Sequence, residues 1–273
     1  MNRITSKDGT SIACERIGEG PALVLVDGAL CYRASGPNKP LAERLASSFT
    51  VYTYDRRGRG DSENRGPYAI EREVEDLEAV IAAAGGTAYV YGISSGAALA
   101  LAAAARLSCV RKLALFEAPF IVDGSRALLP TDYSATMDAL LASGKRGAAI
   151  KHFLGKGVGV PGPIVAMMPL MPGWSKMKAV AHTLPYDVKL TIDYQRGEPL
   201  PAETWRGVTI PTLVLDGGKS PAWMRSAMSS LADALPNADY RTLPDQTHIV
   251  KPDALAPALK QFFYKETDLI PAP

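Results

Sequence analysis

The chain has few of the residues from which metal sites and disulfide frameworks are built. Its 273 residues include three cysteines and three histidines, and no two cysteines have the C-x-x-C spacing. The odd set of Cys14, Cys31 and Cys109 indicates free thiols in a reducing compartment. The sequence therefore predicts no metal centre, and none of its motifs indicates a bound cofactor.

Long apolar runs and an excess of charge of one sign are also missing. Residues 1–20 contain no apolar segment of the kind found in signal peptides, and the Ala-rich run 97–105 is too short to span a bilayer. The 30 basic and 28 acidic side chains are interspersed, which leaves a formal net charge of +2. We therefore expect a cytoplasmic protein that has neither a membrane nor nucleic acid as a partner.

Short apolar runs recur along the chain and predict a parallel sheet that is buried on both faces. Helical stretches separate several of these runs, and such alternation predicts right-handed βαβ crossovers. A hairpin is expected around residues 7–10, and a C-terminal helix over 253–265 should turn Phe262 and Phe263 inward. The predicted strands are 22–26, 49–54, 88–91, 112–116, 212–215 and 238–242, and the predicted helices between them are 70–84 and 97–106.

Residues 120–206 interrupt this alternation. The stretch contains helical pieces and many prolines but no strand run, so it predicts a helical cap inserted into a core formed by 1–119 and 207–273. Met168, Met171 and Trp174 belong to an apolar cluster in this stretch. They are candidates for the lining of a substrate pocket, and the alternative is that they form the cap's own core.

The pentapeptide Gly92-Ile93-Ser94-Ser95-Gly96 lies between a predicted strand and a predicted helix. G-x-S-x-G in this setting is typical of a nucleophile elbow, in which a sharp turn exposes the serine hydroxyl above the sheet. Small residues at 92 and 96 permit the strained backbone of such a turn, and the helix N-terminus directs its free N–H groups to the same place. We therefore expect Ser94 to be a nucleophile.

A serine hydroxyl reacts only when a base removes its proton, so a histidine is needed further along the chain. His248 follows the last predicted strand and precedes the C-terminal helix, in a loop that would lie over Ser94. His152 and His182 fall within the cap and are expected to be surface or packing residues. His248 is thus the predicted base.

With these motifs the chain resembles the α/β-hydrolase superfamily, in particular its serine esterases and non-haem haloperoxidases with a helical cap. The segment Asp55-Arg56-Arg57-Gly58-Arg59-Gly60-Asp61-Ser62 is similar to the D-x-R-G-x-G-x-S turn of many members, where it is mainly structural. The resemblance covers essentially the whole chain and implies a mostly parallel central sheet flanked by helices. It also implies an oxyanion hole formed by the backbone N–H groups of Ala29 and Ser95.

Two positions depart from the pattern of that superfamily. Asp27 stands where members usually carry histidine before a glycine, and we expect its side chain to turn away from the oxyanion; the alternative is a contact with a substrate hydroxyl. The usual triad acid is also missing, because the G-x-x-D position holds Ser220. Glu117, directly after strand 112–116, is the predicted replacement, and the alternatives are Asp216 or no acid at all.

These residues predict a serine hydrolase that acts on a small-molecule carboxylic ester through an acyl-enzyme intermediate. A serine at the elbow argues against haloalkane dehalogenation and epoxide opening, which need an aspartate there. Carbon–carbon bond hydrolysis, lactone opening, thioester hydrolysis and perhydrolysis use the same Ser–His pair and stay open as alternatives. A non-catalytic small-molecule binder on the same fold is the remaining alternative.

Overall fold

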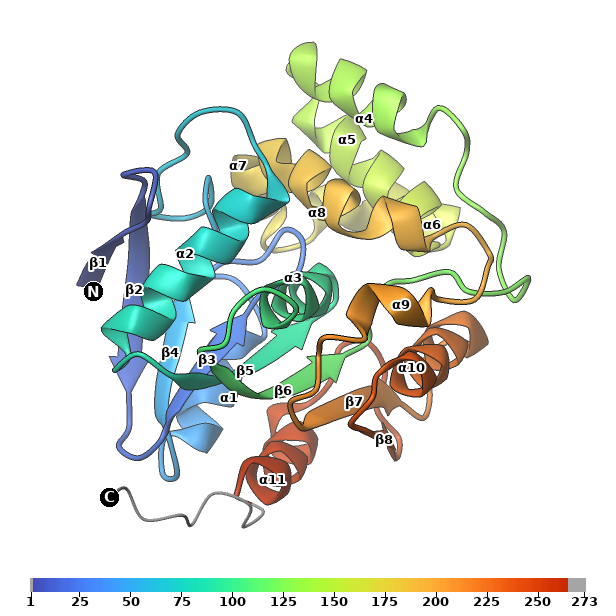
Figure 1. The fold of residues 1–273 in the computed structure, drawn as a ribbon. Helices are drawn as coiled ribbons and strands as arrows, with labels where there is room; N and C mark the ends of the chain where they lie inside the picture. The colour runs from blue at the N-terminus through green and yellow to red at the C-terminus, as the bar shows by residue number, and fades with distance from the viewer. Residues whose placement is uncertain (1, 265–273) are drawn as a thin grey trace, which may run out of the picture.

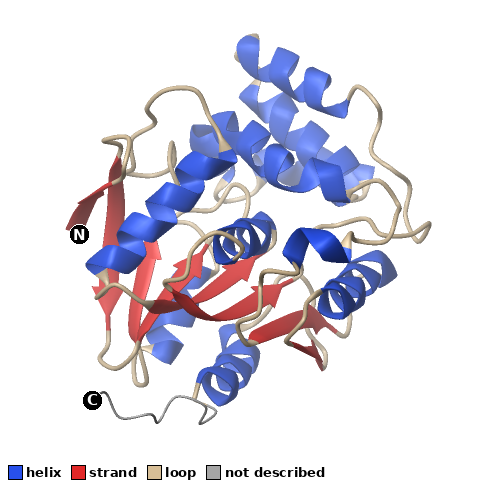
Figure 2. Cartoon of the chain, in the orientation of Figure 1, coloured by secondary structure: helices blue, strands red, loops and turns tan. Residues whose placement is uncertain are grey.

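The computed structural model describes residues 2–264, and its centre is an eight-stranded sheet in the order β1-β2-β4-β3-β5-β6-β7-β8 (Figures 1 and 2). β2 pairs antiparallel with both β1 and β4, and the strands from β4 to β8 run parallel. The expected mostly parallel sheet is confirmed. Its strands are β1 (Asn2–Thr5), β2 (Ser11–Ile17), β3 (Ala22–Val26), β4 (Thr50–Tyr54), β5 (Ala88–Ile93), β6 (Val110–Phe116), β7 (Thr212–Gly217) and β8 (Ala238–Leu243).

Helices cover both faces of the sheet (Figure 1). One face packs against α1 (Asn38–Leu45) and α11 (Pro252–Phe263), and the other packs against α2 (Ile70–Ala83), α3 (Ser95–Ala104) and α10 (Ala222–Ala234). Phe262 and Phe263 are buried as expected, whereas Lys265, the expected end of α11, lies outside the described residues. The longest of these helices, α2, has 14 residues, and no helix within 2–264 is long and apolar enough to cross a membrane.

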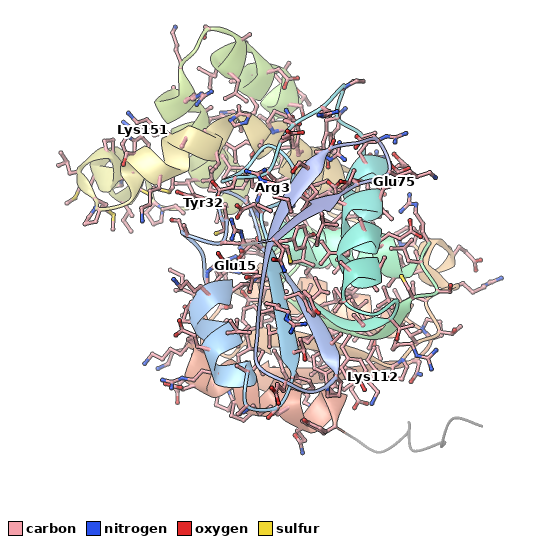
Figure 3. All side chains as sticks on the ribbon, turned by 90° about the vertical axis from the view of Figure 1, so that its left-hand side faces the viewer. Arg3, Glu15, Tyr32, Glu75, Lys112 and Lys151 are labelled. Atoms are coloured by element: carbon pink, nitrogen blue, oxygen red, sulfur yellow. The ribbon has the colours of Figure 1, made fainter. Side chains whose placement is uncertain are left out.

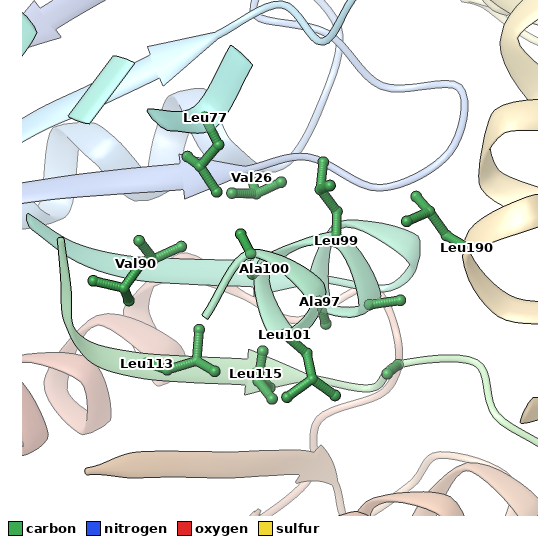
Figure 4. Packing of buried hydrophobic residues seen from close by; sticks show 14 of the residues in the cluster. Val26, Leu77, Val90, Ala97, Leu99, Ala100, Leu101, Leu113, Leu115 and Leu190 are labelled. Atoms are coloured by element: carbon green, nitrogen blue, oxygen red, sulfur yellow. The ribbon is translucent and has the colours of Figure 1, made fainter. Parts of the chain in front are cut away.

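The centre of the core is the contact between α3 and the middle of the sheet. Figure 4 shows Val26 of the sheet close to Ala100 of α3 and Leu115 of the sheet close to Leu101, and all four side chains are at most 1% exposed. α3 is apolar on all sides because the sheet lies on one side of it and other helices lie on the other. Its many alanines let the helix approach the strands closely, which fixes the position of its first residue.

The segment between β6 and β7 contains only helices and turns, and we call residues 120–206 the cap segment. In Figure 1 its helices between residues 133 and 191 lie beyond the ends of the parallel strands, whereas the short helix at 202–205 lies beside α10, and Figure 3 shows Lys151 of this segment far from Lys112 of the sheet. α8 reaches back to the core, where Leu190 is buried against α3. The helices are α4 (Tyr133–Ala142), α5 (Arg146–His152), a π-helical turn (Phe153–Val158), α6 (Gly162–Met167), α7 (Trp174–Val180), α8 (Leu184–Thr191) and α9 (Ala202–Trp205).

Candidate active site

Ser94 occupies the sharp turn between β5 and α3. Its backbone has φ 57° and ψ −130°, a conformation that costs a non-glycine residue about 1–3 kcal/mol and persists only where the surroundings impose it. A Cβ atom at Gly92 would lie 2.4 Å from the carbonyl oxygen of Gly96, and a Cβ at Gly96 would lie 2.4 Å from that of Val26. The turn therefore requires both glycines, as the sequence predicts.

The two predicted oxyanion donors lie on either side of Ser94. Gly28 is in contact with Ser94, since a Cβ atom placed on Gly28 would be 2.9 Å from the Cβ of Ser94. Ala29 follows in the loop after β3 and lines a cavity that Ser94 also lines. Ser95 is the first residue of α3, so its backbone N–H lies in the helical turn that has no intrahelical acceptor.

His248 and Glu117 form a close pair at the same edge of the sheet. His248 Nδ1 lies 2.7 Å from Oε2 of Glu117, whose side chain is completely buried while that of His248 is 32% exposed. Glu117 directly follows β6 in a left-handed conformation, with φ 47°. Its other oxygen, Oε1, accepts the backbone N–H of Gly217 at 2.8 Å, so the carboxylate is fixed from two directions.

Asp216, the rival acid, has a different partner. It is buried at the end of β7 and accepts a hydrogen bond from the Tyr240 hydroxyl. Ser220, at the position usual for the acid, has a buried hydroxyl for which the described residues offer no hydrogen-bond partner. The structure therefore brings Glu117 to His248 and leaves Asp216 and Ser220 apart from it.

The loop that carries His248 is tied to the end of β7. Lys219 donates its backbone N–H to the carbonyl of Gln246 at 2.8 Å, and the Gln246 side chain accepts the backbone N–H of Lys251 at 3.1 Å. Asp245 turns the chain with a positive φ of 61°. These bonds hold the loop on both sides of His248 and limit how far its imidazole can move.

Two cavities meet at Ser94 and His248, and the cap segment covers both. The first, of about 40 Å³, is lined by Ser95 and by polar side chains of the cap, among them Thr191 and Gln195. The second, of about 410 Å³, is lined mainly by apolar groups, which include Ala29, Leu30, Phe153, Leu154, Met177 and Ile249. The small cavity also has apolar walls, among them Phe153 and Trp223, so a substrate carbonyl at Ser94 would have a small compartment on one side and a larger apolar one on the other.

Comparison with known protein families decides the classification. The model of the alpha/beta hydrolase family matches residues 23–258, which is most of the chain. The chain belongs to this family. The resemblance noted from the motifs is therefore confirmed, and the protein is an α/β hydrolase.

Individual relatives of this α/β hydrolase include esterases. A pimeloyl-[acyl-carrier protein] methyl ester esterase of Xanthomonas axonopodis pv. citri is 28% identical over an alignment 280 positions long, gaps included, which covers 90% of this chain and 96% of the relative. The enzyme of the same name from Xanthomonas oryzae pv. oryzae is 38% identical over 149 residues, and the match spans about half of each chain, 49% and 56%. The crystal structure of an alpha/beta hydrolase from Sphaerobacter thermophilus is 55% identical, with a TM-score of 0.90, and the match covers 96% of this chain and 100% of that one.

The three cap residues singled out from the sequence lie outside both cavities of this α/β hydrolase. Met168 and Met171 belong to the outer part of the cap, where Met171 is 52% exposed. Trp174 packs near Gly147 and lines a separate open hollow on the surface. This placement keeps them apart from Ser94 and His248, and short helices interrupted by prolines do not reveal from sequence which face turns inward.

Asp27 also lies outside both cavities. It is 2% exposed and accepts the backbone N–H of Asn38, while its Oδ1 has no partner among the described residues. Burial raises the pKa of this carboxyl group to about 7, although the charges of Arg59 and Arg56 work in the opposite direction. The side chain therefore turns away from the oxyanion position, which is the first of the two expectations stated for it.

The arginines of the turn after β4 are buried and paired. Each is at most 1% exposed and contacts at least one carboxylate, so the turn is a closed network rather than a site for an anion. One partner, Asp187 of the cap helix α8, was not singled out from the sequence. The signal was present, because Asp187 is the sole acidic residue between Asp138 and Asp193. The ion pairs are Arg56 with Glu73 and Asp187, Arg57 with Asp76 and Asp8, and Arg59 with Asp187.

Proposed function

We propose that this α/β hydrolase is a serine esterase in which Ser94 is the nucleophile, His248 the base and Glu117 the acid. The observation that carries the proposal is the 2.7 Å contact between His248 Nδ1 and Glu117, made by a histidine that lines the same two cavities as Ser94. Glu117 holds the Nδ1–H and so leaves Nε2 as the basic nitrogen on the side of the substrate. It also stabilises the imidazolium that forms during the reaction.

The reaction proceeds in two similar halves. His248 Nε2 takes the proton from Ser94 Oγ, which forms a bond to the ester carbonyl carbon while the π electrons move onto the carbonyl oxygen. The tetrahedral intermediate collapses, and the alcohol leaves with the proton from His248. Water then attacks the acyl-enzyme with the same help from His248, which releases the acid and restores Ser94.

The carbonyl oxygen becomes negative in both halves and needs hydrogen-bond donors that are already in place. The backbone N–H groups of Ala29 and Ser95 supply them, since both residues adjoin Ser94 from different elements. One such donor is worth roughly 10² to 10³ in kcat in well-studied serine hydrolases. Asp27 does not oppose this charge directly, because its side chain is turned away from both cavities.

The substrate is a carboxylic ester with one small and one larger apolar part. The cavity of about 410 Å³ accommodates the larger part against Phe153 and Met177, and the cavity of about 40 Å³ accommodates a group of a few atoms. The methyl ester esterases of Xanthomonas support ester hydrolysis, since their names describe enzymes that remove a one-carbon alcohol. The same Ser–His pair serves lactone opening and carbon–carbon bond hydrolysis, and rates on a lactone and a 1,3-diketone, measured beside those on the esters below, separate the three reactions.

The test combines covalent labelling with turnover. A fluorophosphonate should add once to the wild-type protein, as measured by intact mass, and should fail to add to Ser94→Ala. p-Nitrophenyl esters of increasing acyl length and methyl esters should then be hydrolysed with burst kinetics. A wild-type protein that is folded but neither labelled nor active on any ester would reject the esterase and favour a small-molecule binder.

A further inference from the structure

A buried carboxylate of the cap segment, Asp187, lines the small cavity beside Ser94 and Ser95. Asp187 in α8 is 1% exposed and receives four hydrogen bonds. Arg59 Nη2 donates to both of its oxygens, at 2.8 and 2.7 Å, and Arg56 Nη1 donates to Oδ1 at 2.7 Å. The fourth hydrogen bond comes from the Ser95 hydroxyl, also at 2.7 Å from Oδ1.

The same two arginines also donate hydrogen bonds to carbonyl oxygens at the end of β3 and in the loop that follows it. Arg59 Nη1 donates to the carbonyl oxygen of Gly28 at 2.6 Å, and Arg56 Nη1 lies 3.3 Å from that of Asp27. The carbonyl of Gly28 and the N–H of Ala29 belong to one trans peptide, in which the two groups point in opposite directions. Fixing the carbonyl therefore also fixes the direction of the Ala29 N–H.

The other donor is reached through a side chain of its own residue. Ser95 contributes its backbone N–H to the oxyanion hole and its hydroxyl to Asp187, so the carboxylate holds the residue that begins α3. One carboxylate thus connects both donors, and it comes from a helix that belongs to neither of them. Leu30, the residue after Ala29, has a positive φ of 62°, and a strained loop of this kind keeps its shape only when its surroundings hold it.

We propose that Asp187 is a positioning residue, which from the cap segment fixes the two backbone donors of the oxyanion hole through Arg59 and through the Ser95 hydroxyl. This inference rests on the proposed serine esterase function. Asp187 does not react with the substrate; it acts through the peptide of Gly28 and Ala29 and through the start of α3. The position of the cap segment on the core and the orientation of the two oxyanion donors are therefore coupled.

The charges make this arrangement effective. Burial alone would raise the pKa of Asp187, but Arg59 and Arg56 lower it below its usual value, so the carboxylate is ionised. In the described part of the chain Asp187 is the acidic partner of Arg59, whereas Arg56 also pairs with Glu73. A cation hydrogen-bonded to a carbonyl polarises its peptide and strengthens the donor at the other end, an effect that low local dielectric increases.

A matched pair of variants tests the proposal. Asp187→Asn keeps the shape and removes the charge, and Asp76→Asn does the same to an equally buried carboxylate that pairs with Arg57, away from Gly28 and Ser95. We expect Asp187→Asn to lower kcat for an ester by about 10- to 100-fold with KM changed less than threefold, a loss below that of a whole donor. Asp76→Asn should keep kcat within about twofold of the wild-type value, even if it lowers the thermal unfolding midpoint as much as Asp187→Asn does.

Affinity for a transition-state analogue distinguishes a positioning residue from a residue that only stabilises the fold, because loss of stability alone would leave this affinity unchanged. A trifluoromethyl ketone, whose adduct with Ser94 carries the oxyanion, should bind Asp187→Asn more weakly by the same factor by which kcat/KM falls. Ser95→Ala, which removes only the hydroxyl contact, should lower kcat about fivefold and serves if Asp187→Asn does not fold.

Equal kcat values in Asp187→Asn and Asp76→Asn would overturn the proposal. So would a loss confined to KM, or an unchanged affinity for the trifluoromethyl ketone. A Ser95→Ala variant whose kcat equals that of the wild type would also overturn the proposal. These outcomes are separable from failure of the esterase itself, because in that case the wild-type protein would not react with the fluorophosphonate or hydrolyse esters.

Discussion

The two sides of the proposed active site are built in different ways. On the sheet side, Ser94 and Glu117 each directly follow a central strand, with φ of 57° and 47°, so neighbouring strands hold both backbones in strained conformations. On the cap side, Phe153 belongs to a π-helical turn, and Leu170 on the outer surface is 84% exposed. The comparison places the proposed chemistry on rigid elements and substrate choice on short, loosely packed ones.

Asp187 is an exception to this difference between the sheet side and the cap side. It belongs to the cap segment, yet it is buried as deeply as Glu117 and is bound to two arginines from the turn after β4. Breaking a buried ion pair by removing one partner costs about 3–5 kcal/mol, so this junction resists separation. α8 is therefore held to the core by buried ion pairs, whereas the outer surface of the cap segment at Leu170 is exposed.

The largest effect is expected where the sheet side supplies the nucleophile and base. Ser94→Ala and His248→Ala should each lower kcat on an ester by roughly 10⁴- to 10⁶-fold, and the double variant should lose no more, because the two residues act as one unit. Steady-state rates on a p-nitrophenyl ester measure this, and circular dichroism verifies the fold. If a folded Ser94→Ala protein retained a tenth of the wild-type rate, the elbow would not carry the nucleophile.

The next largest effect should separate the two candidate acids. Glu117→Gln should lower kcat by about 10³- to 10⁴-fold, by analogy with loss of the aspartate from a protease triad, because His248 loses the group that fixes its tautomer. Asp216→Asn is the control, since that carboxylate is equally buried and bonds to Tyr240 instead. We expect it to change kcat less than tenfold, and the opposite ranking would assign the role to Asp216.

Much of the sheet side can be read from the sequence. Apolar runs predict the central parallel strands because these are buried on both faces, and the glycines around Ser94 predict the turn because any side chain there would meet backbone atoms. Glu117 follows from its place directly after β6 at the carboxyl edge. α1 and α10 are absent from the predicted elements, although Trp223, Met224, Ala227, Met228 and Leu231 of α10 form a buried face with helical spacing.

The contacts of the cap segment are harder to predict from the sequence, because they join residues that are far apart along the chain. Arg59 and Asp187 are 128 positions apart, and no local pattern indicates that they meet. Helices as short as the six residues of α6 expose or bury a methionine depending on how neighbouring turns orient them. Met168, Met171 and Trp174 have the composition of a pocket lining, yet Phe153 and Met177 hold that place.

Substitutions in the cap segment should sharpen the contrast between its inner and outer faces. Met177→Ala enlarges the apolar cavity and should shift the preferred acyl length upward, changing the ratio of kcat/KM between a long and a short ester by about tenfold, as one or two methylene groups do. Met171→Ala is the matched control, because that side chain is 52% exposed and outside both cavities. Equal shifts from both variants, measured on p-nitrophenyl esters, would contradict this division.

The smallest effect on turnover is expected for a substitution of Asp27. This substitution should instead change how the free energy of unfolding depends on pH. The pKa of Asp27 is about 7 in the folded protein and near 4 when unfolded, so between these values the folded state holds a proton that the unfolded state has lost. Stability therefore falls as pH rises through this window, and the loss between pH 5 and pH 8 is about 2–3 kcal/mol. Asp27→Asn cannot ionise and should not share this loss.

Urea unfolding of both proteins at pH 5 and pH 8 measures the difference. At pH 5 wild-type Asp27 is largely protonated and nearly the same shape as asparagine, so the two proteins should have similar free energies of unfolding and this pH serves as the control. At pH 8 the variant should be the more stable by about 2–3 kcal/mol, with no fall in kcat, since the side chain lies outside both cavities. Parallel pH dependences would show that Arg56 and Arg59 fully compensate the buried charge, and the sheet side would then contain no unsatisfied carboxylate at this position.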